Sequence, residues 1–283
     1  MNDQRNRSRL LPRIGATVNH TVLIATSALM LLPFSWMLAT SLRLPKDSFN
    51  LPPALLPTSF HTANYTAVFR DVPFFSFILN SVAVTAVATI LQCIISAAAA
   101  YPFARMKFRG RNALFLLMLS GLMIPVQVTV IPLFLMFRQV DLIDTRTALV
   151  LPALVFPMGI FILRQHMLTL PTSYEEAARL DGAGHLRIFW NVILPMSRPA
   201  LVVVAMLSGL ATWNDFFRPL IFINSIDKMT IPLGLTVLDG FARTSNIAVV
   251  LAGVVISIVP PLVLFILGSR HLVRGMALTG LKG

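Results

Sequence analysis

The sequence predicts an all-α integral membrane protein with six transmembrane helices and a polar helical hairpin between the fourth and fifth of them. Two observations support this prediction. Only 12% of the 283 residues are charged and 56% are hydrophobic, whereas roughly a quarter of the residues in a soluble domain are charged. The charges are also clustered, so several charge-free runs reach the about 17–25 residues that a helix needs to cross a hydrocarbon core.

Six apolar runs define the expected spans. They lie at about 18–41, 77–103, 112–137, 147–163, 200–222 and 247–268. The first run follows a basic tail at 1–13, and we interpret it as an uncleaved span because it is longer than the apolar core of a signal peptide. Residues 14–268 therefore form one transmembrane domain, which a tail at 269–283 follows.

The third and fourth spans carry unusual residues. Pro125 and Pro132 flank Gln127 in the third span, and backbone that is broken inside a bilayer is normally buried in protein or faces a watery cavity. Gln127 is therefore a candidate for a polar pathway, and a kinked helix packed on its neighbours is the alternative. The fourth span is short, and Arg164 at its end could extend it by snorkelling to the interface.

The longest polar interruption, 171–195, predicts two short amphipathic helices. Ser173 and Glu176 have the spacing of a capping box at the start of the first helix. The turn that follows contains Gly182, which tolerates the backbone angles that a tight turn needs. The second helix is expected to end at Pro195 and to bury one apolar face, which consists of Leu186, Phe189, Trp190 and Ile193.

The basic charge of the chain follows the expected topology. The N-terminal tail, the loops at 104–112 and 164–199 and the C-terminal tail carry 15 basic residues and a net charge of +11, while the other loops carry 8 and +1. Because an excess of Lys and Arg marks the cytoplasmic side, both termini and the hairpin are expected in the cytoplasm. No basic surface remains that would indicate nucleic-acid binding.

No arrangement typical of an enzyme is present in the sequence. The five histidines are scattered, and there is no metalloprotease spacing and no phosphate-binding loop. The single cysteine, Cys93, lies inside a span, where packing is its expected role. Apart from the fifth, the spans have no ionisable residue in their apolar centres, although a carrier driven by an ion gradient normally needs one. We therefore expect no catalytic residues, no metal site and no cofactor bound by this chain, so energy must come from a partner or transport must be passive.

Several stretches resemble the permease subunits of ABC importers. Glu176-Ala177-Ala178, then Gly182, then Val192-Ile193-Leu194-Pro195 reproduces the motif E-A-A-x3-G-x9-I-x-L-P, with Val192 where the pattern has Ile. Further stretches are similar to the carbohydrate branch of these permeases, which includes the maltose-system inner-membrane subunits: NSVAVTAVAT at Asn80, AYPFARMKFRGR at Ala100, EEAARLDGAG at Glu175, TWNDFFRPL at Thr212 and the ending RGMALTGLKG. The similarity covers nearly the whole chain.

The resemblance implies the fold of a type I ABC importer permease, in a prokaryotic cytoplasmic membrane, for a sugar or sugar-like solute. The implied partners are a second homologous permease subunit, a dimer of ABC ATPase subunits that binds ATP and Mg, and an extracytoplasmic solute-binding protein. The hairpin would be the coupling helix that lies in a cleft of the ATPase. The implied coupling residues are Glu175, Glu176, Ala177, Ala178, Asp181, Gly182, Ala183, Leu194 and Pro195.

Several alternatives remain open at this point. Trp213, Asn214 and Asp215 could line the translocation path or contact the binding protein, with Asp215 and Arg218 placed as i, i+3 neighbours; an interfacial aromatic belt with an ion pair is the other interpretation. The hairpin could instead lie on the membrane surface, although surface-binding helices favour basic residues and its first helix is acidic. The alternative functions are an ABC permease for peptides or amino acids, a stand-alone secondary carrier or channel, and a membrane enzyme or scaffold.

Overall fold

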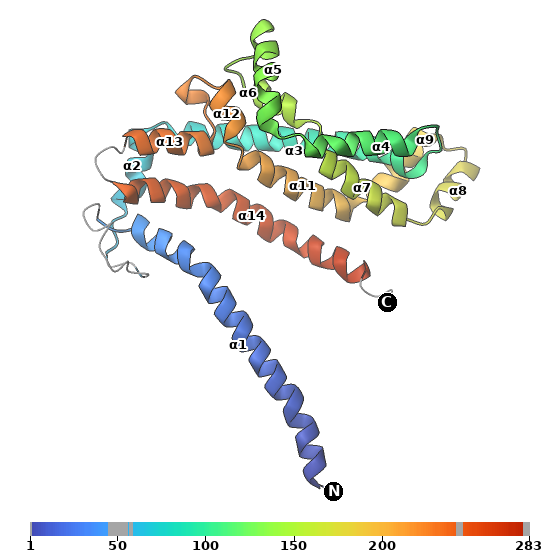
Figure 1. Ribbon diagram of the computed structural model, residues 1–283, viewed down its shortest axis with the longest axis horizontal. Coiled ribbons are helices and arrows are strands. Elements are labelled where there is room, and N and C mark those ends of the chain that lie inside the picture. Colours follow the sequence, from blue (N-terminus) through green and yellow to red (C-terminus); the bar gives the residue numbers. More distant parts are fainter. Residues whose placement is uncertain (1, 45–55, 57–58, 242–245, 280–283) are drawn as a thin grey trace. The chain divides into compact units, whose positions relative to one another are not determined.

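The computed structural model describes the backbone of residues 2–44, 56, 59–241 and 246–279, and side chains at 19–44, 56, 59–240 and 246–268. Regular structure in these described ranges is helical throughout, so the all-α prediction is confirmed. The chain forms two compact units (Figure 1). The first unit consists of residues 1–72 and 238–256, and the core unit consists of residues 73–237 and 257–283.

The first unit contains the long helix α1, Asn2–Ser41, and the short helix α2, Ala63–Asp71. The last carbonyl groups of a helix have no partner inside the helix. Asn64 at the start of α2 supplies such partners, because its Nδ2 donates to the carbonyl oxygens of Ser41 at 2.9 Å and Arg43 at 2.8 Å. The hydroxyl groups of Ser41 and Tyr65 are also hydrogen-bonded, at 2.8 Å. The residues after α1 are thereby fastened to α2.

The core unit holds the remaining helices. Their bounds are α3 Phe74–Arg105, α4 Arg111–Ser120, α5 Val126–Gln139, α6 Arg146–Val150, α7 Pro157–Thr169, α8 Ser173–Leu180, α9 His185–Ile188, α10 Leu194–Met196, α11 Arg198–Trp213 and α12 Phe217–Phe222. Two further helices, α13 Ile231–Phe241 and α14 Ile247–Thr279, belong partly to each unit. Short 3-10 turns lie at Gly121–Met123, Leu151–Ala153 and Ile226–Lys228, and a π-helical turn lies at Phe189–Ile193.

Helices α3, α7 and α11 form the centre of the core unit. Gly159 of α7 allows their close approach, because a Cβ atom there would lie 2.6 Å from Phe156 Cδ1, 2.8 Å from Ser96 Oγ and 3.0 Å from Val204 Cγ1. Gln92 of α3 is buried and donates through Nε2 to the carbonyl oxygen of Ala153 at 2.5 Å. Ala153 precedes the break before α7, so this bond satisfies a carbonyl group at a helix end.

Three helices are long and apolar enough to cross a membrane by length and composition. They are Asn19–Ser41, Phe74–Arg105 and Ile247–Gly268. Three bent helix pairs raise the number to six if each pair is one span: Arg111–Met123 with Val126–Gln139 at 94°, Arg146–Ala153 with Pro157–Thr169 at 42°, and His185–Met196 with Arg198–Trp213 at 77°. The prediction of a multi-pass helical membrane protein agrees with this architecture.

The region expected as a fifth span, 200–222, is two helices. Helix α11 ends at Trp213 and α12 begins at Phe217. Asp215 lies in this break, immediately before the N-cap residue Phe216, and its Oδ1 accepts a hydrogen bond from the backbone N–H of Arg218 in the first turn of α12. The loop expected after this region also contains a further helix, α13.

The expected snorkelling of Arg164 is wrong. Helix α7 continues beyond Arg164 to Thr169, so this residue does not lie at a helix end. Its Nε donates to the carbonyl oxygen of Phe103 at 3.1 Å, and its guanidinium group lies 4.1 Å from the centre of the Phe115 ring. Arg164 therefore binds the neighbouring helices α3 and α4.

Candidate functional site

The hairpin of α8 and α9 lies at the end of the core unit where α3 and α7 also finish (Figure 1). The expected capping box is wrong: Thr172 is the N-cap residue, Ser173 is already helical, and no side chain caps the helix. Thr172 has helical backbone angles, φ −71° and ψ −22°. Its carbonyl group can therefore accept from the amides of both Glu175 and Glu176, at 2.9 and 3.1 Å, and the backbone alone closes the first turn.

Gly182 ends α8 in a Schellman motif. Its φ is +79°, in the left-handed region that glycine tolerates best. The amide of Gly182 donates to the Arg179 carbonyl at 3.0 Å, and the amide of Ala183 donates to the Ala178 carbonyl at 2.9 Å. These two bonds define the motif. Ala178 and Ala183, which the motif pairs, both pack on the apolar core below the hairpin.

Glu175 and Glu176 point to different environments. The side chain of Glu175 is buried, and its Oε1 lies 3.0 Å from Nε of Arg105, the last residue of α3. The Nε–H is not aligned with this oxygen, so the contact is an ion pair. Arg179, one turn along α8, approaches Oε2 of Glu175 at 3.4 Å. Glu176 is exposed. Nothing in the sequence marks Arg105 as a partner of the hairpin, although Arg105 belongs to the basic stretch after the second span.

The second half of the hairpin buries a different face from the one expected. Ile188, Phe189 and Ile193 are buried, but Leu186 is 77% exposed and Trp190 is 53% exposed. Leu186 and Ile188 belong to α9, before the π-helical turn, and Trp190 lies within that turn between the buried Phe189 and Ile193. Leu194 and Pro195 come directly after this turn and are partly buried.

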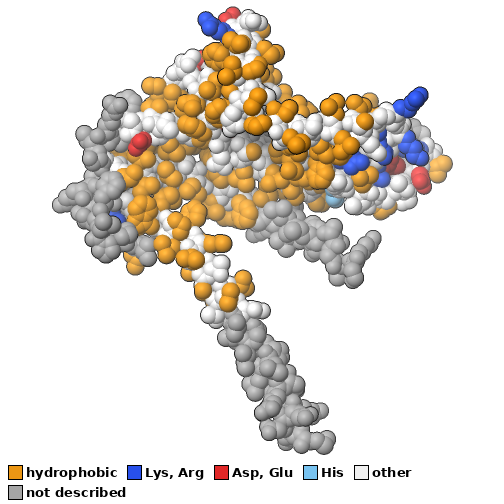
Figure 2. All heavy atoms as spheres, viewed as in Figure 1, with side chains coloured by type: hydrophobic (Ala, Val, Ile, Leu, Met, Phe, Trp, Pro, Cys, Tyr) orange, Lys and Arg blue, Asp and Glu red, His pale blue; other side chains and the backbone are white. Residues whose placement is uncertain are grey.

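A mixed apolar and acidic surface remains exposed on the hairpin. We call it the tip surface, and it consists of Tyr174, Glu176, Ala177, Leu180, Asp181, Gly182 and Leu186. Leu180 is 90% exposed and Tyr174 is 54% exposed. Figure 2 shows Lys and Arg side chains gathered at the same end, and Lys107, Arg109 and Arg187 are among those exposed. Contiguous exposed apolar side chains with a polar surround mark an interaction site.

The other candidate residues do not form one site. Trp213 is buried, and its Nε1 donates to the carbonyl oxygen of Ser257 at 3.2 Å. Asn214 is exposed and donates to the Leu210 carbonyl at 2.9 Å, while Asp215 forms the expected ion pair with Arg218 at 2.7 Å. Gln127 is exposed on α5. In the part of the chain that the structure describes, no hydrogen bond or ion pair joins Gln127 to the other three.

Trp213 also lines a cavity of about 800 Å³ between α3, α11 and the core-unit part of α14. Most of the wall is apolar, with Met206, Val263 and Leu264 among its residues. Thr85 and Thr89 contribute hydroxyl groups, and the indole N–H of Trp213 is already bonded to Ser257. Among its lining residues, therefore, the cavity has few polar groups with which to hold a hydrophilic solute.

Residues 92–277 match a protein family described as "Binding-protein-dependent transport system inner membrane component". The chain belongs to this family. The matched residues include the whole hairpin, α7, α11 and the second half of α3, and they cover more than half of the chain. Membership confirms the prediction of a transport component that is embedded in the membrane, as opposed to an enzyme.

Relatives within this family are similar over most of their length. The "Arabinooligosaccharides transport system permease protein AraQ" of Halalkalibacterium halodurans is 37% identical over 229 residues, which cover 80% of this chain and 81% of AraQ. The "Diacetylchitobiose uptake system permease protein NgcG" of Streptomyces coelicolor is 32% identical over 263 residues, which cover 91% of this chain and 86% of NgcG.

A solved structure shares the fold of this family member. It is a chain from a bacterial ABC transporter that is involved in the import of the acidic polysaccharide alginate. The TM-score is 0.78 at 24% identity, and the match covers 91% of this chain and 96% of that chain. The predicted permease fold is thereby confirmed.

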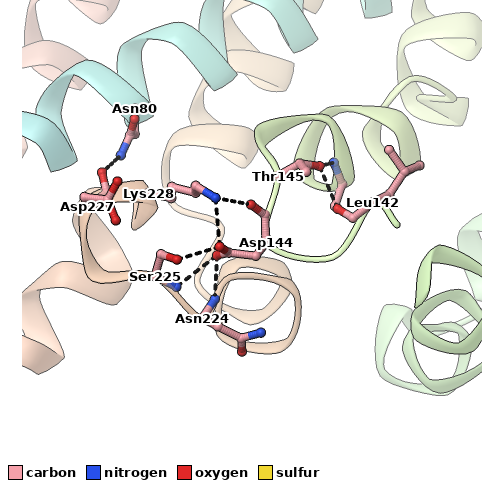
Figure 3. Close-up of polar contacts among 9 residues, drawn as sticks. Asn80, Leu142, Asp144, Thr145, Asn224, Ser225, Asp227 and Lys228 are labelled. Carbon is pink, nitrogen blue, oxygen red and sulfur yellow. Dashed lines mark hydrogen bonds and ion pairs between the residues drawn. The ribbon is translucent and has the colours of Figure 1, made fainter. Parts of the chain in front are cut away.

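At the other end of the core unit, Asp144 fastens two loops of the permease together (Figure 3). Its Oδ1 accepts from the amides of Asn224 and Ser225 at 3.0 and 2.9 Å, and its Oδ2 accepts from Ser225 Oγ and Lys228 Nζ at 2.5 and 2.8 Å. Asn80 of α3 holds the same loop through the carbonyl groups of Asp227 and Met229. No motif in the sequence signals this arrangement, since it joins residues about 80 positions apart.

These contacts set the ionisation of Asp144. Partial burial by itself would raise the pKa of its carboxyl group. The hydrogen bonds from Lys228, Ser225 and Asn224 to the ionised form outweigh burial and hold the pKa well below its usual range. The ionised carboxylate is therefore the form that ties the loops together.

We expect Asp144→Asn to lower the free energy of unfolding by about 1–3 kcal/mol. An amide side chain cannot form the ion pair with Lys228, and its single oxygen cannot accept all the hydrogen bonds that the two carboxylate oxygens accept. A depressed pKa in the folded state stabilises the fold above the unfolded pKa of about 3.9, and this stabilisation is lost as the pH falls towards the folded value. The difference in thermal stability between wild type and variant in detergent should therefore shrink below about pH 4.

Asp141→Asn is the matched control for Asp144→Asn. Asp141 lies in the same loop, also has a left-handed φ, of 52°, and is exposed. Its substitution should change the thermal stability little at any pH. Equal losses for the two variants would contradict the assigned role of Asp144.

Proposed function

We propose that this chain is the membrane-spanning permease subunit of an ATP-driven ABC importer for a sugar or sugar-like solute. The observation that carries the proposal is the tip surface, an exposed apolar and acidic patch on a hairpin that has the sequence motif and the Schellman turn of a rigid docking element. The names of the relatives support the solute class, since arabinooligosaccharides and diacetylchitobiose are carbohydrates.

The tip surface has the chemistry to bind a protein partner. Leu180 and Tyr174 offer apolar area, and the small Ala177 allows a close approach. Glu176 can form a charge-assisted hydrogen bond with a basic group of the partner. The partner is the ATPase dimer, in which ATP and Mg are bound, so this chain itself needs no nucleotide or other cofactor.

Orientation follows from the distribution of charge. The loops on the hairpin side carry the excess of Lys and Arg, which supports a cytoplasmic location of the hairpin and both termini. The loops tied together by Asp144 then face the extracytoplasmic solute-binding protein. The membrane is the prokaryotic cytoplasmic membrane, because binding-protein-dependent import operates there.

Movement of the ATPase reaches the membrane through the buried side of the hairpin. Ile188, Phe189 and Ile193 belong to the same apolar cluster as residues of α3, α7 and α11. When ATP binding closes the ATPase dimer, the tip surface moves with it, and the packed helices follow as a body. The pathway then changes the side on which it is open.

The pathway needs a second permease subunit. The cavity beside Trp213 has mainly apolar walls, so the polar groups that recognise a sugar must come from elsewhere. A second homologous permease that faces this chain would supply the other half of the pathway. Gln127, Asn214 and Asp215 remain candidates for contacts with the solute or the binding protein.

Reconstitution tests the proposed function. The complex should be purified with its ATPase, second permease and binding protein, and the solute that the binding protein retains should be identified by mass spectrometry. In liposomes, uptake of that solute should require ATP, the ATPase and the binding protein together. Uptake by this chain alone under an ion gradient would instead show a secondary carrier, and a retained peptide or amino acid would overturn the solute class.

A further inference from the structure

Two arginines link α3 and α7, each through a hydrogen bond to a carbonyl group at the end of the other helix. Arg164 of α7 donates to the carbonyl oxygen of Phe103 in the last turn of α3, at 3.1 Å. Arg105 of α3 donates through Nη2 to the carbonyl oxygen of Leu170, directly after α7, at 2.6 Å. Carbonyl groups at helix ends lack partners within their own helix. Each helix therefore satisfies the end of the other, and the two ends are locked together.

Arg105 extends this lock to α8. Its Nε lies 3.0 Å from Oε1 of Glu175, and the side chains are only 7% and 5% exposed. Placing charges in a buried position is costly unless they are paired with good geometry, so a buried pair often has a role in positioning. We call Arg105, Arg164 and Glu175, with the carbonyl groups of Phe103 and Leu170, the clasp.

The remaining contacts of α8 with the core unit are of another kind. Ala178 packs on the apolar cluster through a small side chain. The other ion pair of Glu175, with Arg179, stays within α8 and does not link this helix to another one. Among the described side chains, the ion pair of Arg105 with Glu175 is the charged link between α8 and the end of a long helix. Arg105 is itself held by its hydrogen bond to the Leu170 carbonyl group, so its ion pair with Glu175 ties α8 to a fixed point at the end of α3.

We propose that Arg105 is the positioning residue that holds α8 in register with α3, so that movement of the tip surface is transmitted to the second span as well as to α7 and α11. This inference rests on the proposed function. The clasp lies under α8 and the tip surface lies on its outside, so the ATPase can bind without touching Arg105. Loss of the clasp should therefore separate ATPase binding from transport.

The transport arm of the test compares Arg105→Gln, Arg105→Lys, and the double variant Arg105→Glu with Glu175→Arg. For Arg105→Gln we expect the ATPase to remain stoichiometric on purification and the solute imported per ATP hydrolysed to fall at least tenfold. Arg105→Lys, which keeps the charge but loses the fork of donors, should fall between this variant and wild type. In the double variant the solute imported per ATP hydrolysed should rise part of the way back to the wild-type value. The reason is that this variant restores the ion pair but not the hydrogen bond to the Leu170 carbonyl group.

The matched control is Arg179→Ala, which removes the outer, half-exposed partner of the same carboxylate. Its ratio of import to hydrolysis should match that of wild type. An unchanged ratio in Arg105→Gln would overturn the proposal. A parallel loss of ATPase binding and solute uptake in Arg105→Gln would also overturn the proposal, because Arg105 would then only maintain the shape of the docking surface. If Arg105→Gln does not accumulate in the membrane, Arg105→Lys and the double variant decide by the same criteria.

A second arm does not depend on transport. Hydrogen exchange of the backbone amides of α8 should be measured in the purified full-length chain, and Arg105→Gln should speed it about tenfold while Arg179→Ala leaves it unchanged. Unchanged exchange in Arg105→Gln would overturn the positioning role. A wild-type complex that imports no solute would contradict the proposed function. If Arg105→Gln still showed faster exchange in that case, Arg105 would remain the residue that positions α8.

Discussion

Glu176→Lys is expected to lower solute uptake and binding-protein-stimulated ATP hydrolysis at least tenfold in reconstituted complexes, while the chain still inserts into the membrane. Glu176 is exposed on the tip surface, so its substitution leaves the buried pair of Glu175 and Arg105 intact. A lysine facing a basic group of the ATPase would replace attraction by repulsion, and like charges at an interface are strongly unfavourable. Both rates should be measured in the same preparation.

Two further variants serve as controls for Glu176→Lys. Glu176→Gln keeps the size of the side chain and removes its charge, so its uptake should be intermediate. Asp227→Lys imposes the same change of charge at the other end of the core unit, where Asp227 is exposed. Its complex should insert and retain the ATPase as wild type does. Normal uptake by Glu176→Lys with the ATPase bound would contradict the coupling role of this residue.

Gly182→Val should remove most of the ATPase that co-purifies with the chain. The backbone at Gly182 has φ +79°, and a residue with a Cβ loses about 1–2 kcal/mol in the left-handed region, with branched side chains the least tolerated. The Schellman turn would open, and the tip surface would lose its shape. The measurement is the molar ratio of ATPase to permease after affinity purification.

Gly184→Val is the matched control for this experiment. Gly184 has φ −74° and ψ 168°, an extended conformation that valine adopts readily. A Cβ atom would meet nothing within 4 Å at either glycine, so the two variants differ in backbone strain and not in crowding. Gly184→Val should retain the ATPase. A stoichiometric complex from Gly182→Val would count against the hairpin geometry as the basis of docking.

The sequence predicted the features that depend on local chemistry. Charge-free runs gave the multi-pass helical fold, and the spaced motif located the hairpin and the glycine at its turn. The expected need for a residue that tolerates turn angles is confirmed by the φ of +79° at Gly182, and the structure adds the two hydrogen bonds of the Schellman motif. In the same way, the i, i+3 spacing of Asp215 and Arg218 predicted their ion pair, which the structure confirms.

Features that depend on tertiary contacts could not be predicted. Two adjacent glutamates look equivalent in the sequence, and only the position of Arg105 at the end of α3 determines that Glu175 is the buried one. The second half of the hairpin includes a π-helical turn, whose hydrogen bonds span five residues, so a 3.6-residue period does not describe this segment.

Two helix boundaries were missed because composition alone decided them. The run at 200–222 reads as one span by composition, yet α11 ends inside it at Trp213 and α12 begins at Phe217. The region between the fifth and sixth expected spans was expected as a loop, but α13 lies within it at Ile231–Phe241. The absence of a side chain at Gly234 is what lets the ring of Phe77 approach the helix, since a Cβ there would lie 2.2 Å from Phe77 Cδ2.

Site-specific photo-cross-linking at Leu180 tests the central claim, that the tip surface docks on the ATPase, most directly. A photo-reactive amino acid should replace Leu180, which is 90% exposed, and in a separate chain Ile226, which is 44% exposed on the loop held by Asp144. The assembled complex in native membranes should give an ATPase adduct from position 180 and none from position 226. Lipid adducts alone at position 180, or an ATPase adduct from position 226, would contradict the account.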